Sequence, residues 1–214
     1  GEPIAYITGR KEFYGLDFYV DNRVLVPRPE TEIMIEKALE LAQRRPIVTI
    51  ADVGTGCGAI AVSLAVHLPD ATIYATDSSA GALEVARVNC EKHNVTGRVR
   101  LLPGNLLEPL PEPVDLIVAN LPYVKTADIP GKGPLSYEPR AALDGGADGL
   151  DRIRQFCPQV KDKRRPGGWV LMEIGMGQSK AITGIVKRSF PTARIEIFPD
   201  LACIERVACF CLAA

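Results

Sequence analysis

The hydrophobic pattern divides this chain of 214 residues into two parts. Up to residue 46, aromatic and β-branched residues are interrupted by glycine and asparagine, whereas from residue 47 short apolar runs alternate with segments of helical periodicity. Alternating strands and helices are typical of βαβ units, whose strands lie parallel and whose helices cover both faces of the sheet. We therefore predict an α/β fold with a mostly parallel sheet.

Seven apolar runs predict the strands of that sheet, at residues 48–53, 72–76, 99–102, 114–119, 169–174, 195–198 and 206–211. Helices are predicted between them, at residues 59–68, 80–93, 150–160 and 178–189. In the first part, Gly15 marks the turn of a predicted hairpin, and an acidic segment ending at Glu32 starts a predicted helix. We expect this hairpin and helix, residues 1–46, to pack on a main domain of residues 47–214.

Charge and hydropathy exclude few classes of protein. With 25 basic and 26 acidic residues, the net charge gives no reason to expect direct binding of nucleic acid or of a membrane surface. No signal peptide opens the chain, and no apolar stretch approaches the length of a membrane span. We expect a soluble cytoplasmic protein.

The cysteines and histidines predict no metal site. The cysteines form no CxxC pair and no Cys/His cluster with zinc spacing, which favours reduced, buried thiols. They are Cys57, Cys90, Cys157, Cys203, Cys209 and Cys211. His67 and His93 fall near the ends of predicted helices, where we expect a solvated surface position.

A glycine-rich loop follows the first strand of the main domain. Alternate glycines in Gly54-Thr55-Gly56-Cys57-Gly58 allow a tight turn and the close approach of a flat ligand. The second strand ends at Asp77, about 20 residues further on, where a carboxylate can bind the two hydroxyls of a ribose. Asn105 and Leu106, which follow the third strand, can contact and cover an adenine. An adenosine-containing cofactor is therefore expected, and with Ala59 the loop also fits the NAD pattern GxGxxA.

The stretch Asn120-Leu121-Pro122-Tyr123 follows the fourth predicted strand. An amide or exocyclic amine is a poor nucleophile because its lone pair is delocalised, so a methylating enzyme must point that lone pair at the methyl group. Asn120 Oδ1 and the Leu121 carbonyl can each accept one N–H, while Pro122 fixes the turn and Tyr123 offers a face for stacking. The pattern favours methylation of nitrogen without a general base, and a plain strand-to-loop turn is the alternative.

The long connection over residues 124–148 is rich in proline, glycine and charge. A loop of this size beside a strand-end site is usually functional, so residues 136–140 are candidates for closing the pocket. A surface excursion is the alternative.

Seven stretches of the chain resemble the motifs of a known family. The matching stretches cover nearly the whole sequence: residues 3–9, 12–15, 26–32, 52–61, 120–123, 137–143 and 166–168. They are similar to the HemK-type family, which belongs to the Rossmann-like class I S-adenosylmethionine-dependent methyltransferases and methylates a glutamine of class I peptide release factors. The Pro-Arg-Pro-Glu-Thr-Glu stretch at residues 27–32 separates this family from general amino-methyltransferases.

The resemblance implies a function in translation termination and a role for each motif. The three glycines, with Thr55 and Cys57, would bind the methionine part of S-adenosylmethionine, Asp77 its ribose, and Asn105 with Leu106 its adenine. Residues 120–123 would hold the glutamine of the release factor's Gly-Gly-Gln loop, with Asn120 also near the cofactor. Further substrate contacts are expected from Arg28, Glu30 and Glu138. A small helical domain that precedes the catalytic domain in the family would already have ended before Gly1.

Three positions depart from the family pattern. Leu121 replaces the usual proline, which keeps the carbonyl but loses the rigidity of a second proline. Asn105 stands where aspartate is usual, and Cys203 stands where glycine is usual.

Two other functions remain as alternatives. An amino-methyltransferase acting on a base of RNA or DNA would use the same tetrapeptide on a flipped base, although the chain has no basic excess. A module that binds the cofactor without transfer would fit the change at Leu121. An NAD-dependent reductase fits less well because no hydride-transfer acid or Tyr/Lys pair stands in the right place.

Overall fold

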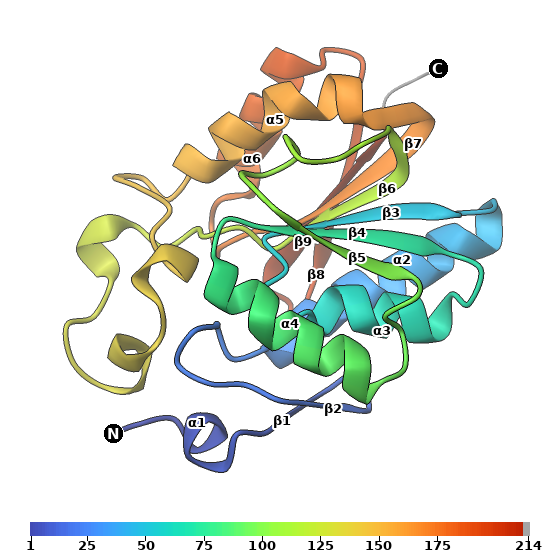
Figure 1. Cartoon of the computed structure of the whole chain (residues 1–214). Helices are drawn as coiled ribbons and strands as arrows, with labels where there is room; N and C mark the ends of the chain where they lie inside the picture. The colour runs from blue at the N-terminus through green and yellow to red at the C-terminus, as the bar shows by residue number, and fades with distance from the viewer. Residues whose placement is uncertain (212–214) are drawn as a thin grey trace.

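A seven-stranded sheet forms the centre of the protein in the computed structural model, which describes residues 1–211 (Figure 1). Its spatial order is β5-β4-β3-β6-β7-β9-β8, and only β9 runs antiparallel to its neighbours. The strands are β3 (Thr49–Val53), β4 (Thr72–Asp77), β5 (Val99–Pro103), β6 (Val114–Ala119), β7 (Arg164–Glu173), β8 (Arg194–Pro199) and β9 (Glu205–Cys211). The predicted Rossmann-like α/β fold with seven strands is confirmed.

Helices cover both faces of this sheet. Figure 1 shows α2 (Glu32–Arg44), α3 (Ala59–His67) and α4 (Ala80–Lys92) below it, and α5 (Asp151–Lys163) and α6 (Ser179–Ser189) above it. The central strand β3 is buried along its whole length, and α3, which packs against both α2 and α4, is apolar nearly all round. Because both faces of the central strands are covered, these strands form continuous apolar runs.

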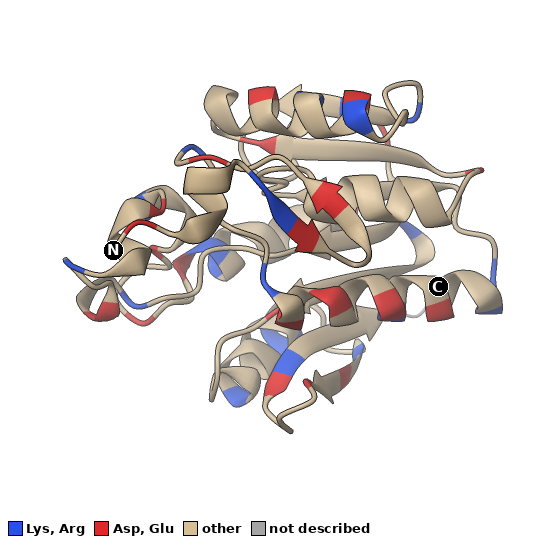
Figure 2. Cartoon of the chain, turned by 90° about the horizontal axis from the view of Figure 1, so that it is seen from below, with Lys and Arg blue, Asp and Glu red and all other residues tan. Residues whose placement is uncertain are grey.

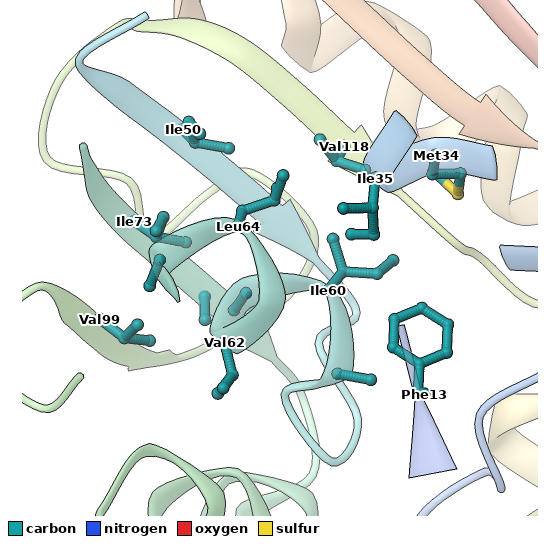
Figure 3. Close-up of a cluster of buried hydrophobic side chains, with 14 of the residues drawn as sticks. Phe13, Met34, Ile35, Ile50, Ile60, Val62, Leu64, Ile73, Val99 and Val118 are labelled. Atoms are coloured by element: carbon teal, nitrogen blue, oxygen red, sulfur yellow. The ribbon is translucent and has the colours of Figure 1, made fainter. Parts of the chain in front are cut away.

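The core below the sheet joins the N-terminal part to the main domain. Phe13 of the hairpin and Met34 and Ile35 of α2 pack in the same buried cluster as Ile50 of β3 and Ile60 of α3 (Figure 3). The hairpin pairs β1 (Lys11–Phe13) with β2 (Leu16–Phe18), and Tyr14 and Gly15 have φ of 49° and 71°, which suits a tight two-residue turn. The division at residue 46 into two units stays a prediction.

The structure adds elements that the pattern did not predict. A short helix, α1 (Ile4–Thr8), precedes the hairpin, and Tyr6 of this helix donates from its hydroxyl to the carbonyl of Val24. A 3-10 turn, η1 (Pro29–Thr31), leads into α2. The long connection contains η2 (Thr126–Asp128), η3 (Pro134–Tyr137) and η4 (Arg140–Ala142). Each of these 3-10 turns spans only three or four residues, which is too short to show a periodic pattern.

Two boundaries differ from the prediction. Strand β7 starts at Arg164, five residues before the predicted start at residue 169, and the register against β6 shifts between Val114 and Leu116, which absorbs Pro166. Helix α5 extends to Lys163 although it contains Pro158. A proline in the first turn of a helix costs little, because the N–H that it lacks would have no partner there. Pro158 lies beyond the first turn and removes one backbone hydrogen bond of α5. The packing of the apolar face of α5 against the sheet outweighs this loss.

The prediction of buried cysteines is confirmed for four thiols and not for the other two, of which Cys211 is partly buried. Cys57, Cys90, Cys157 and Cys209 are buried, and all six cysteines are free. Cys203 is exposed in the turn between β8 and β9, with φ of 60°. This left-handed backbone explains why glycine is the usual residue there.

Acidic and basic positions are interspersed along the chain in the view of Figure 2. His67 is exposed at the end of α3, as expected, whereas His93 is partly buried beside Phe18, with ring centroids 5.2 Å apart. Within residues 1–211, no helix is long and apolar enough to cross a membrane.

Candidate active site

A cleft of about 220 Å³ opens at the carboxyl edge of the sheet. Its floor consists of the loops that follow β3, β4, β5 and β6, which converge there because parallel strands end at the same edge. Most predicted site residues line it: Arg28, Gly54, Thr55, Gly56, Cys57, Asp77, Asn105, Leu106, Asn120, Leu121 and Pro122. Gly58, Tyr123, Glu30 and Glu138 do not.

The glycine loop presents backbone to the cleft. Gly54 and Gly56 have φ of 72° and 56°, so a side chain at either position would be strained. A Cβ on Gly56 would meet nothing within 4 Å, which leaves this backbone open for close approach by a ligand. Gly58 acts differently. A Cβ there would lie 3.3 Å from Cβ of Ala86, so this glycine allows α3 and α4 to pack closely.

Asp77 is held at the end of β4 by the loops on either side. Its Oδ2 accepts from the Gly56 N–H at 2.9 Å, and its Oδ1 accepts from the Ser79 N–H at 2.9 Å. The carboxylate therefore bridges the glycine loop and the start of α4, where the Ser79 hydroxyl caps the helix by accepting from the Ala82 N–H. A partly exposed carboxylate fixed in this way can still accept hydrogen bonds from ribose hydroxyls.

Beneath the loop lies a carboxylate that the sequence analysis did not single out. Asp52, at the end of β3, is completely buried, and its Oδ2 accepts from the Thr55 hydroxyl at 2.6 Å and the Ala61 N–H at 3.1 Å. Its Oδ1 has no hydrogen-bond partner within residues 1–211. Burial raises the pKa of Asp52 to about 7. The side chain thus ties the loop to the start of α3.

Asn120 lies beside the start of the glycine loop, at the end of β6, which pairs with β3. Its Nδ2 group donates to Oγ1 of Thr31 at 3.2 Å and to Oε2 of Glu173 at 3.0 Å. These two acceptors lie 2.5 Å apart, so they share one side of the amide nitrogen and hold it inside the protein, while Oδ1 forms no hydrogen bond with any described residue. The carbonyl of Leu121 is likewise without a partner inside residues 1–211, while the Leu121 side chain is buried. Two acceptors are left available.

Tyr123 lies behind Asn120 rather than along the cleft. Its hydroxyl donates to Oε1 of Glu173 at 3.0 Å, and its ring packs so closely on Gly175 that a Cβ there would lie 3.1 Å away. Burial, followed by the charge of Glu173, raises the pKa of Tyr123 well above its usual range. Stacking of Tyr123 on a substrate stays a prediction, and the structure adds a contact that holds the ring from behind.

The wall facing the strand ends is closed by an ion pair between distant segments. Glu138, which is 6% exposed, accepts from the Arg28 guanidinium and from the Val26 N–H at 3.3 Å. This contact joins the long connection to the segment before η1, and Pro139, Ala141 and Ala142 then line the cleft. Glu30 is exposed and lies outside the lining. Part of the segment predicted to close the pocket therefore forms its wall.

Several lining or supporting residues escaped the sequence analysis. They are Phe13, Arg23, Thr31, Ser79, Arg152 and Glu173. Of these, Glu173 carried a recognisable signal, because a carboxylate ending an otherwise apolar strand is costly to bury without partners. The others come from the hairpin, η1, the loops and α5, and only the tertiary structure brings them to the cleft.

Comparison with known proteins identifies the family. A family model described as the methyltransferase small domain matches residues 31–131. The release factor glutamine methyltransferase of Moorella thermoacetica is 45% identical over 212 residues, which are 98% of this chain and 74% of that protein. The chain belongs to the release factor glutamine methyltransferase family. The enzyme of the same name from Geobacter sulfurreducens is 46% identical over 88% of this chain and 66% of its own length.

Solved structures agree on the fold. A methyltransferase from Pyrococcus furiosus superposes with a TM-score of 0.68 at 20% identity, covering 94% of this chain and 91% of that one. The N-terminal domain of human METTL16 in complex with SAH gives a TM-score of 0.62 at 17% identity, covering 92% and 76%. At these identities the likeness concerns the fold. Within residues 1–211, the observed glycine loop and Asp77 suit the adenosyl cofactor of a methyltransferase family member.

Proposed function

We propose that this family member transfers a methyl group from S-adenosylmethionine to the side-chain amide nitrogen of a glutamine in a class I peptide release factor. The observation that carries the proposal is the paired acceptor at the end of β6. Asn120 Oδ1 and the Leu121 carbonyl stand without partners within the described chain, and Asn120 and Leu121 line the same cleft as the open glycine loop. A cytoplasmic location is part of the proposal.

The cofactor side is built from backbone and one carboxylate. Gly54 and Gly56 allow the methionine part to lie close to the main chain, and Asp77 is placed to accept from the ribose hydroxyls. Asn105 and Leu106 line the cleft next to Asp77 and are assigned to the adenine. When bound, S-adenosylmethionine supplies an electrophilic methyl group, and the protein supplies position.

The acceptor side orients the substrate amide. Asn120 Oδ1 and the Leu121 carbonyl each accept one N–H of the glutamine side chain, which turns the nitrogen lone pair out toward the cofactor side. Pro122 holds the turn that presents both acceptors. No basic group is needed before transfer, because the methylated nitrogen becomes acidic and water can remove its proton afterwards. Arg28 and Glu138 shape the entrance through their ion pair.

The test is transfer of labelled methyl to three acceptors offered separately: an unmodified release factor, the same factor with its Gly-Gly-Gln glutamine changed to alanine, and duplex DNA or ribosomal RNA. We expect label on the intact factor alone. Label on nucleic acid would replace the proposal with methylation of a base. An absence of label from all three, with cofactor binding intact, would reduce the chain to a binding module.

A further inference from the structure

Glu173 is a buried carboxylate placed beside the acceptor site by the register of the sheet. Strand β6 pairs in parallel with β7, with Ala119 opposite Met172, so the next residues along the two strands, Asn120 and Glu173, are neighbours at the carboxyl edge. Glu173 is 3% exposed. Because a buried carboxylate is costly unless it is paired, its partners are informative.

Three donors from two segments, η1 and the stretch that follows β6, point at this carboxylate. Oε2 accepts from the Thr31 hydroxyl at 2.5 Å and from Asn120 Nδ2 at 3.0 Å, and Oε1 accepts from the Tyr123 hydroxyl at 3.0 Å. Thr31 Oγ1 also accepts from Asn120 Nδ2 at 3.2 Å. Because these two acceptors lie 2.5 Å apart, they share one side of Asn120 Nδ2, and the network directs that side of the amide toward Glu173.

The network allows one orientation of the Asn120 amide. If the amide were rotated by half a turn, its oxygen would face Oε2 of Glu173, an acceptor against an acceptor. Its Nδ2 group would then point into the cleft and offer donors to the N–H groups of a substrate amide. The direction of Asn120 Oδ1 toward the cleft therefore depends on the Glu173 carboxylate, which accepts from the other end of the amide.

We propose that Glu173 is a positioning residue whose carboxylate, held by Thr31 and Tyr123, keeps Asn120 Oδ1 directed at the substrate nitrogen. This inference rests on the proposed function and deepens it. Glu173 itself does not touch the substrate. The motif that holds the substrate amide thus extends beyond residues 120–123 to the end of the neighbouring strand and to η1.

The charge state of Glu173 matters because all three contacts donate to it. Burial raises the pKa of Glu173, and Glu30 adds to this, whereas the donations from Thr31 and Tyr123 and the charge of Arg206 oppose it. Protonation would introduce a competing donor where Asn120 now donates. Transfer should therefore fall in acid, over a range above that of an ordinary glutamate, and Glu173→Gln should lose this limb of the pH profile.

The first experiment separates Glu173 from general stability. Glu173→Leu removes every acceptor, and it should lower kcat for the release factor by about 10² or more while KM and the affinity for S-adenosylhomocysteine change less than about threefold. Glu173→Gln can place its oxygen toward Asn120 and Thr31 and its amide toward the Tyr123 oxygen, so at neutral pH it should keep most of the activity. Glu196→Gln, the same change at an exposed site on β8, is the matched control and should be unaffected.

The second experiment exchanges donor and acceptor. Asn120→Asp alone sets a carboxylate against Glu173 and should lose about 10² or more of the rate. Combined with Glu173→Gln, the introduced aspartate accepts from the glutamine amide and keeps its other oxygen toward the cleft. The double variant should then be at least about tenfold faster than Asn120→Asp alone, a coupling that a merely structural Glu173 would not produce.

A readout independent of transfer distinguishes the possible failures. In the wild-type protein the Asn120 side-chain amide proton directed at Glu173 should exchange slowly with solvent in NMR spectra, and in Glu173→Leu it should exchange quickly. Slow exchange in the wild type with no methylation of the release factor would overturn the proposed function and leave the orientation of Asn120 supported. Wild-type kcat in Glu173→Leu, or no gain in the double variant, would overturn the role given to Glu173.

Discussion

The two sides of the cleft are held together in different ways. On the cofactor side, Asp77 bonds to residues 21 and 2 positions away in the sequence, and the loop is shaped by glycine dihedral angles. On the acceptor side, the bonds around Asn120 and Glu173 join residues separated by 50 to 142 positions. A local site depends on backbone conformation, whereas an assembled site depends on the register of the sheet. Changes on the two sides should therefore have separable effects on binding and on transfer.

The largest expected effect is on the acceptor side. Asn120→Ala removes an aligned acceptor and should lower the transfer rate by about 10² or more while the cofactor affinity stays nearly intact. Single-turnover transfer and calorimetry with S-adenosylhomocysteine measure the two quantities on one preparation. Transfer at the wild-type rate would show that Asn120 has no part in holding the amide.

On the cofactor side the expected effect is smaller and of the opposite kind. Asp77→Ala removes a charged acceptor and leaves the Gly56 N–H without its partner. A hydrogen bond to a charged group typically contributes about 1.5–3 kcal/mol, so the affinity for the cofactor should fall by about tenfold or more. At saturating cofactor the transfer rate should change less. An unchanged affinity in calorimetry would remove the ribose assignment.

The wall opposite the strand ends should affect substrate binding. Arg28→Met leaves Glu138 buried without its cation, so we expect the wall to loosen and KM for the release factor to rise by roughly tenfold with a smaller change in kcat. The steady-state rate is measured over a range of release factor concentrations. Arg28→Met combined with Glu138→Gln, which removes the uncompensated charge, is the control and should recover part of the loss. Equal KM values in all three proteins would argue against a role for this wall.

The last prediction concerns stability rather than activity. Because burial raises the pKa of Asp52 from about 3.8 to about 7, the folded state binds more protons than the unfolded state at pH values between these two. Stability from this group is therefore present at low pH and declines as pH rises toward 7, by up to about 1.4 kcal/mol per pH unit. Urea unfolding of the wild type and Asp52→Asn should show a flatter pH dependence in the variant. Parallel curves would contradict a raised pKa.

The Leu121 side chain connects the acceptor side of the cleft to the cofactor side. Its side chain is buried and would lie 3.6 Å from a Cβ on Gly54, so it packs across to the cofactor loop, while its carbonyl stays free within the described chain. The departure from the family proline therefore changes the packing between the two sides and keeps the acceptor. This is compatible with transfer.

Local pattern was sufficient for most of the fold and for the cofactor side. Apolar runs located the seven strands because buried parallel strands require them, and the glycine loop and Asp77 follow strands whose ends must meet at one edge. Asn120 was recognisable for the same reason, since it ends a buried strand. The short helix α1, the turns of the long connection and the bulge in β7 carried no periodic signal.

The contacts that support the acceptor side are visible only in the folded protein. Thr31, Glu173 and Tyr123 meet around Asn120 because η1 packs over the edge of the sheet and β7 lies beside β6 in one register. No spacing in the sequence encodes such a meeting, since a shift of one residue between two strands would turn Glu173 to the other face. Local patterns in the sequence identify the groups at the end of each strand. The packing of distant segments brings some of those groups into contact.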